Sequence, residues 1–155
     1  MQRLWRYVGI AIFWIAWPIF WLALPHTRRT RILIIHTKKI LVVKTWISNG
    51  KWSLPGGGLH KHEDAGHGVL RELNEETGIS LRLDQIEPLA KNTYQDTGLR
   101  FTCHYYSAAL IKEPPLHPQQ LEITELKWVD PASLNRDNAG LDVLSAIDAY
   151  AESKS

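Results

Sequence analysis

Three glutamates at helical spacing are the feature that most restricts what this chain can fold into. Glu72, Glu75 and Glu76 stand at i, i+3 and i+4 within a helix predicted from Asp64 to Thr77, so their carboxylates share an arc of about 100°. Gly78 supplies the usual helix stop. Like charges at this spacing repel by a few tenths of a kcal/mol per pair, so the arrangement favours a cation among them.

Oxygen ligands of this kind indicate a hard divalent cation, Mg²⁺ or Mn²⁺. Mg²⁺ takes few carboxylates, keeps waters and shares the rest of its shell with substrate phosphates. Arg71 lies beside Glu75 on the helical wheel, where it could orient a carboxylate. For an isolated run of acids, a solvated surface face without chemistry is the alternative interpretation.

The residues around the glutamates repeat a longer pattern. Gly57 is followed after five residues by Glu63 and after seven more by Arg71-Glu72-Leu73, then by Glu75-Glu76 and Gly78-Ile79. This resembles the complete Nudix box, G-x5-E-x7-R-E-U-x-E-E-x-G-U, where U is a bulky aliphatic residue, and Trp52 to Gly57 resembles its lead-in. By element order the resemblance extends from about Arg31 to Ala151.

The resemblance implies a Nudix fold, an α/β/α sandwich with a mixed sheet, and Mg²⁺-dependent hydrolysis of a diphosphate linkage in a nucleoside diphosphate derivative. It implies that Glu72, Glu75 and Glu76 bind the metal and that Arg71 holds them in place. The backbone at Gly56 or Gly57 would approach the metal or the phosphate, since glycine removes the Cβ that would block it. Glu63 either supports this cluster or favours the helix N-terminus.

The catalytic base is open among three carboxylates. Glu122 is the first candidate and Glu125 the second, because their segment resembles the late strand that often brings a further carboxylate to the metals. Glu72 is the third, because a metal-cluster carboxylate can also accept a proton from water.

The substrate is less constrained than the reaction. Candidate stacking or phosphate-contact residues are aromatic or cationic side chains outside the box: Trp46, Tyr94, Arg100, Tyr105 and Tyr106. Nucleoside triphosphates, nucleotide sugars, dinucleotides and a lipid-linked diphosphate all stay open. A non-catalytic nucleotide-binding module is the rival from another class. His60 and His62 are interpreted as exposed loop residues.

The N-terminal segment differs from the rest of the chain in being apolar and uncharged over a long run. Tyr7 to Pro25 is nineteen residues without a charge, about the length that crosses a bilayer, and no small-x-small cleavage site follows it. We therefore expect residues 1–30 to be a membrane anchor with a basic flank, and 31–152 to be the Nudix domain. The excess of Lys and Arg after the run predicts a cytoplasmic domain, with Arg28, Arg29 and Arg31 at the lipid headgroups. A signal peptide and a packed apolar helix are the alternatives.

Charge and cysteine content exclude other classes. Cys103 is the single cysteine, which rules out an internal disulfide framework and a Cys-rich zinc site. After residue 25 the chain has 16 basic and 16 acidic residues, so it lacks the broad basic footprint of a nucleic-acid-binding protein.

Hydrophobic patterning predicts the order β-β-α-β-β-β-α for the remaining chain. The expected elements are a hairpin within 31–46, the helix to Thr77, strands over Leu81–Leu89, Leu99–Leu110 and Leu121–Val129, and a closing helix over Leu141–Ala151. A strand lead-in at Lys91–Tyr94 precedes the second of these strands.

Overall fold

A computed structural model describes residues 26–45, 48, 50–96, 99–117 and 123–154 of the 155-residue chain. The predicted membrane anchor at 7–25 lies outside these residues, as do Trp46 and Glu122. No helix in the described part of the chain is long and apolar enough to cross a membrane.

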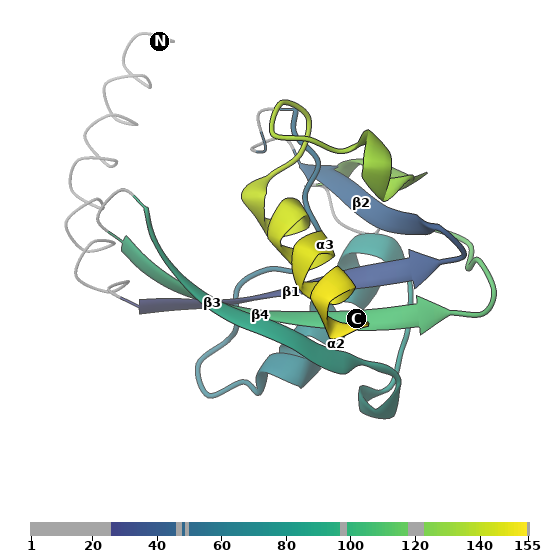
Figure 1. Ribbon diagram of the computed structural model, residues 1–155. Coiled ribbons are helices and arrows are strands. Elements are labelled where there is room, and N and C mark those ends of the chain that lie inside the picture. The colour runs from purple at the N-terminus through teal and green to yellow at the C-terminus, as the bar shows by residue number, and fades with distance from the viewer. Residues whose placement is uncertain (1–25, 46–47, 49, 97–98, 118–122, 155) are drawn as a thin grey trace, which may run out of the picture.

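The centre of the fold is a mixed five-stranded sheet (Figure 1). Its strands are β1 (His26–His36), β2 (Lys39–Thr45), β3 (Glu87–Asp96), β4 (Leu99–Leu110) and β5 (Ile123–Val129). They lie in the order β3-β4-β1-β2-β5. β1 and β4 run parallel, while the other neighbouring pairs are antiparallel, which confirms the predicted mixed sheet.

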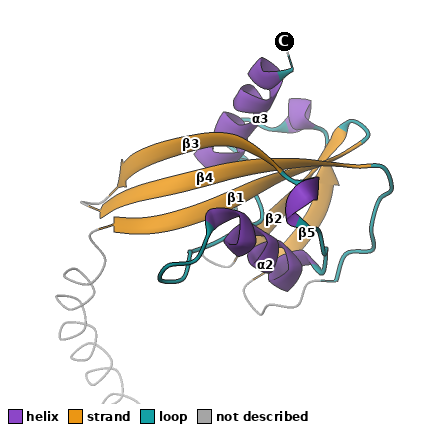
Figure 2. Cartoon of the chain, turned by 90° about the horizontal axis from the view of Figure 1, so that it is seen from below, coloured by secondary structure: helices purple, strands orange, loops and turns teal. Residues whose placement is uncertain are grey.

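Two helices cover opposite faces of the sheet, α2 (Ala65–Thr77) on one and α3 (Leu141–Ser153) on the other (Figure 2). Each face has its own core because successive strand residues point to opposite sides. Ile32 packs with Val69 and Leu73 on the α2 side. Leu33 packs with Val143 on the α3 side. The α/β/α arrangement is therefore the one expected.

Local signals in the sequence set the ends of α2. The carboxylate of Asp64 accepts hydrogen bonds from the backbone N–H groups of Gly66 and His67, at 2.9 and 3.2 Å, and so caps the helix. At the other end Gly78 has φ +77° and its N–H donates to Asn74, the left-handed stop that glycine adopts without strain.

The order β-β-α-β-β-β-α is confirmed, but two boundaries differ from the expected ones. The predicted strand over Leu81–Leu89 is wrong in its first half: Leu83–Gln85 forms a short 3₁₀ turn, and β3 begins only at Glu87. β1 begins at His26 rather than near Arg31, because it pairs with β4 from that residue onward.

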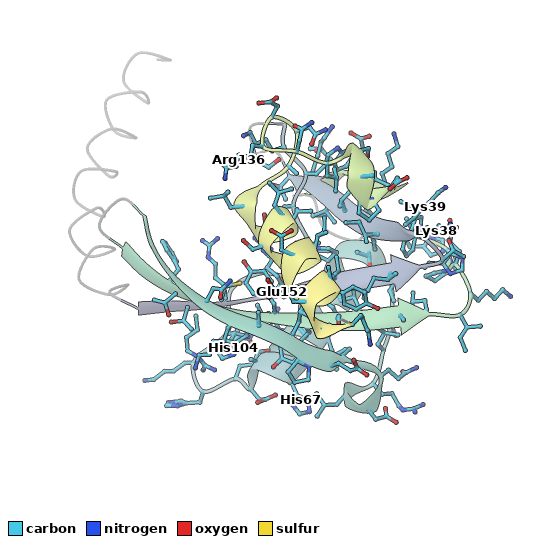
Figure 3. All side chains as sticks on the ribbon, in the orientation of Figure 1. Lys38, Lys39, His67, His104, Arg136 and Glu152 are labelled. Atoms are coloured by element: carbon cyan, nitrogen blue, oxygen red, sulfur yellow. The ribbon has the colours of Figure 1, made fainter. Side chains whose placement is uncertain are left out.

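The basic residues after the apolar run are consequently part of the sheet. Arg28, Arg29 and Arg31 belong to β1. Lys38 and Lys39 lie where β1 turns into β2, at the opposite end of β1 from His26 (Figure 3).

The sheet opens where β1 and β2 separate. The two strands pair only at Ile35 with Ile40 and at His36 with Lys39. Beyond that point the segment 53–57 enters between them. Its carbonyl groups accept hydrogen bonds from Ile32 and Thr30 of β1 at 2.9 Å, and Ser53 pairs with Val43 of β2. This insertion carries the glycines and forms one side of a cleft.

Candidate active site

The cleft has a volume of about 1100 Å³ and contains both the acidic helix face and basic residues of β1. Glu72, Glu75 and Glu76 line it from α2, and Arg28, Arg29 and Arg31 from β1. Gly56 to Gly58, Trp52 and Asp142 complete the central part of the wall. The helical spacing of the three glutamates has therefore brought them to one cavity.

Gly56 and Gly57 each leave room that a side chain would fill. Gly56 has φ +131°, and a Cβ there would collide with the carbonyl oxygen of Thr30. A Cβ on Gly57 would meet the carboxylate of Glu72. Glycine is required at the first position by its backbone conformation and at the second by the approach of an acid.

Arg71 joins the acidic residues of the cleft. Its Nε and Nη2 donate to the two carboxylate oxygens of Glu63 at 2.9 and 3.0 Å. Its Nη1 donates to Glu72 at 2.9 Å and to Glu75 at 3.1 Å, and Nη2 also reaches the carbonyl of Gly58 at 3.2 Å. One planar guanidinium thus fixes three carboxylates and the glycine segment, which a lysine could not do.

Glu63 acts through this arginine. Besides the two bonds from Arg71, its carboxylate accepts the backbone N–H of His60 at 2.7 Å. The hydrogen bonds from Arg71, followed by that from His60, lower the pKa of Glu63 from 4.5 to about 2. The pairing with Glu63 in turn raises the pKa of Arg71 further above its usual range. The helix cap is Asp64, so Glu63 supports the cluster.

Glu76 is the buried member of the three glutamates, with 6% of the residue exposed. Its Oε2 accepts the backbone N–H of Gly56 at 2.7 Å. The side chain of Glu72 is 13% exposed and that of Glu75 is 41% exposed. The cleft therefore offers carboxylates at graded depth, the deepest of them tied to the glycine segment.

A second polar group that the sequence did not single out supports the same segment from α3. Asp142 accepts from the hydroxyl of Ser53 at 2.6 Å and from the N–H of Leu54 at 3.1 Å. Arg31 donates to the carbonyl of Gly56, and its Nε lies 3.5 Å from Asp142. An arginine within a β-branched-rich strand and an acid in the first turn of a helix are common features, so neither marks a site in the sequence alone.

The donor set suits a cation that is shared with a ligand. Within the described residues, no three acidic, histidine or cysteine side chains are arranged to enclose a metal by themselves. The oxygens of Glu72, Glu75 and Glu76 nevertheless line one cleft. Mg²⁺ ordinarily binds through one or two carboxylates and completes its shell with waters and phosphates. The residues therefore fit a hard divalent cation whose shell a phosphate completes.

A family model provides the deciding comparison, since the NUDIX domain model matches residues 25–148. The chain belongs to the NUDIX domain family. The match begins one residue before β1, in line with a domain that includes His26 to Thr30.

Three proteins illustrate what this Nudix domain is similar to. A "MutT-like protein" of Streptomyces ambofaciens is 31% identical over 102 residues, which cover 65% of this chain and 62% of the relative. This chain thus matches less than two thirds of that relative's length. The crystal structure of a MutT NUDIX hydrolase from Burkholderia pseudomallei is 22% identical with a TM-score of 0.71, over 80% of this chain and 97% of that one.

The third is the NUDIX domain of Shewanella oneidensis NrtR in complex with ADP ribose, 23% identical with a TM-score of 0.69, over 85% of this chain and 89% of that one. The two structural matches establish the fold.

The predicted substrate residues of the Nudix domain have different outcomes. Tyr94 lies in β3 and Arg100 in β4, and their side chains are not among those described. Tyr105 is wrong as a cleft residue, because it is 2% exposed and packs in the α3-side core. Tyr106 packs against the α2-side core instead of lining the cleft. Both follow from β4 being an inner strand, covered on each face.

Two further sequence interpretations are changed by the geometry. Glu125, a candidate base, forms a 3.0 Å ion pair with Lys44 and does not line the cleft. Arg31 does not lie at lipid headgroups, because its side chain is 19% exposed and bound to Gly56 and Asp142. Cys103 is buried.

Proposed function

We propose that this Nudix domain hydrolyses a diphosphate linkage in a nucleoside diphosphate derivative, with Mg²⁺ or Mn²⁺ bound by Glu72, Glu75 and Glu76. The observation that carries the proposal is the bridge from Arg71 to Glu63, Glu72 and Glu75 at the wall of the cleft. A surface acidic face has no need of an arginine that holds its carboxylates at fixed positions. Arg71 brings one positive charge to the three carboxylates that it bridges, and a substrate-bound metal would offset the repulsion that remains.

The chain's own groups have distinct tasks in this reaction. Arg71 keeps Glu72 and Glu75 in position before the substrate arrives, so little reorganisation is needed. Glu76 ties α2 to Gly56 through the 2.7 Å hydrogen bond, and Gly57 leaves open the space beside Glu72. A divalent cation bound there would neutralise phosphate charge and lower the pKa of the attacking water.

We propose Glu72 as the group that accepts the proton from that water. Its carboxylate lines the cleft and is held on one oxygen by Arg71, at 2.9 Å. Glu125 is less suited because its carboxylate is paired with Lys44 outside the cleft. Glu122 stays a prediction, since it is outside the described residues.

A substrate panel tests the reaction class. The full chain would be incubated with Mg²⁺ and nucleoside triphosphates, a nucleotide sugar, a dinucleoside polyphosphate and a lipid-linked diphosphate, and the products would be separated by chromatography. Cleavage of the linkage yields two phosphate esters, or a monophosphate and pyrophosphate. Hydrolysis of a soluble nucleotide supports the proposal. Tight nucleotide binding with no hydrolysis would favour the non-catalytic module, and turnover of the lipid-linked compound alone would place the substrate in the membrane.

We further propose that residues 7–25 anchor the enzyme to a membrane with the Nudix domain in the cytoplasm. Support comes from the uncharged run and from the arginines that follow it. The numbers of Lys and Arg residues that flank a span determine its orientation when it inserts into the membrane. The full chain should stay in the membrane fraction through alkaline washing. A chain that begins at His26, which keeps β1 whole, should be released and remain folded. A full chain that the wash removes would refute the anchor.

A further inference from the structure

Several cations line the cleft, and Arg29 is among those that form no ion pair with an acidic side chain of the described residues. Arg28 donates to the carbonyl of Glu63 at 3.3 Å, and Lys51 donates to the carbonyl of Arg136 at 2.7 Å. Arg31 is bound to Gly56 and Asp142. Arg29 also lines the cleft, yet no acidic side chain among the described residues lies within salt-bridge distance of it.

The position of Arg29 is fixed by both its backbone and its side chain. In β1 it forms a bridge with Gly58, the residue next to Gly57, whose missing side chain faces Glu72. Neighbouring strands lie about 4.8 Å apart, so the backbone of Arg29 is held close to the glycine segment. Its guanidinium carbon lies 5.0 Å from the centre of the Phe101 ring, which steadies the flat group.

The surroundings of Arg29 favour an anion. Arg29 and Arg31 are two residues apart on a strand and so share a face. Partial desolvation, followed by the charge of Arg31, lowers the pKa of Arg29, which means that its charge is incompletely compensated by protein. The residue is nonetheless exposed, so a ligand in the cleft can reach it. A guanidinium held flat and open in this way matches the paired oxygens of a phosphate.

We infer that Arg29 binds a third phosphate of the substrate, beyond the diphosphate held at the glutamates, and so selects nucleotides with three phosphates over those with two. The inference rests on the proposed function for the location of the first two phosphates. The third phosphate can come from a continued polyphosphate chain or from a phosphate on the nucleoside sugar. Both present the same dianionic group to the arginine.

Equilibrium binding distinguishes these sources. Titration calorimetry on the full chain would use ADP, ATP and ADP carrying a 3′-phosphate, with Ca²⁺ in place of Mg²⁺. Chromatography of each nucleotide after the titration would show that no turnover occurs. Wild-type protein should bind ATP or the 3′-phosphate compound at least about 10-fold more tightly than ADP, the scale of a charge-assisted hydrogen bond. Whichever compound gains identifies the source.

Substitution assigns the gain to Arg29. Arg29→Gln should weaken binding of the preferred compound by about 10- to 100-fold, while the affinity for ADP should change by less than about 3-fold. Arg29→Lys should retain part of the gain, because it keeps charge but loses the fork. Arg82→Gln is the matched control: it removes the same charge from an exposed ion pair with Asp84 away from the cleft, and should change nothing.

Two results would overturn the inference. One is a wild-type protein that binds compounds with two and three phosphates equally well. The other is an Arg29→Gln variant in which the affinities for ADP and for the three-phosphate compound fall by the same factor. Failure of the proposed function looks different. If the wild-type protein prefers three phosphates but hydrolyses no compound of the substrate panel, the proposed enzymatic function is refuted. Arg29 would then still be an anion-binding residue.

Discussion

A Cβ on Gly57 would lie 2.7 Å from the carboxylate carbon of Glu72 and equally close to both of its oxygens. Two residues fifteen positions apart in the chain therefore share one small volume, which belongs to the carboxylate only because position 57 has no side chain. The spacing between this glycine and the glutamate is thus a packing requirement as well as a sequence pattern.

Gly57→Ala should displace the Glu72 carboxylate and lower turnover by about 100-fold, because a shift of around 1 Å in a positioned group is enough for such a loss. The matched control is Gly58→Ala, since a Cβ there meets nothing within 4 Å. Circular dichroism and thermal melting would verify that both variants fold. Equal activity of the two variants would contradict the packing account.

Glu72→Gln and Glu125→Gln separate the candidate bases. We expect kcat to fall by about 100-fold or more for the first, on the scale of general-base catalysis, and by less than about 3-fold for the second. The difference arises because Glu72 lines the cleft while Glu125 is paired with Lys44 on β2. A Glu122→Gln variant completes the series. A loss of kcat in it, with none in Glu72→Gln, would transfer the role to Glu122.

The lowered pKa of Glu63 predicts how the stability of the fold depends on pH. Its pKa is about 2 in the folded protein against 4.5 as the ordinary value, so it stabilises the fold above pH 4.5, and this contribution disappears as pH falls toward 2. Chemical unfolding of wild type and Glu63→Gln should give a free-energy gap that is constant above about pH 5.5 and closes in acid. A gap that is independent of pH would show that the charge of Glu63 is not what Arg71 binds.

The sequence predicted most of the fold because its signals are local. Two runs rich in β-branched residues mark β1 and β2, and Gly78 ends α2 as expected. The error at Leu81–Leu89 has a physical cause: Arg82 binds Asp84 through its guanidinium and Gln85 through its backbone N–H, and these contacts favour a tight turn over an extended chain. Apolar content alone does not reveal such bonds.

The site was predictable only where its residues stand close together in sequence. Arg71 and the three glutamates belong to one helix, so their spacing can be recognised in the sequence. Asp142 and Arg31 reach the cleft from α3 and β1, and only the folded topology brings them to the segment 53–56. The place of Arg29 in the cleft has the same origin, because it bridges Gly58, a residue distant in the chain.

The central claim is that water attacks a diphosphate at the glutamates of this cleft. Its most direct measurement is the incorporation of ¹⁸O from labelled water into the products of the best substrate in the panel, for wild type, Glu75→Gln and Gly58→Ala. We expect one labelled oxygen per cleaved linkage in wild type and Gly58→Ala, only when Mg²⁺ is present. Glu75→Gln should form labelled product at least about 100-fold more slowly than wild type. Unlabelled products, or equal rates in Glu75→Gln and wild type, would contradict the account.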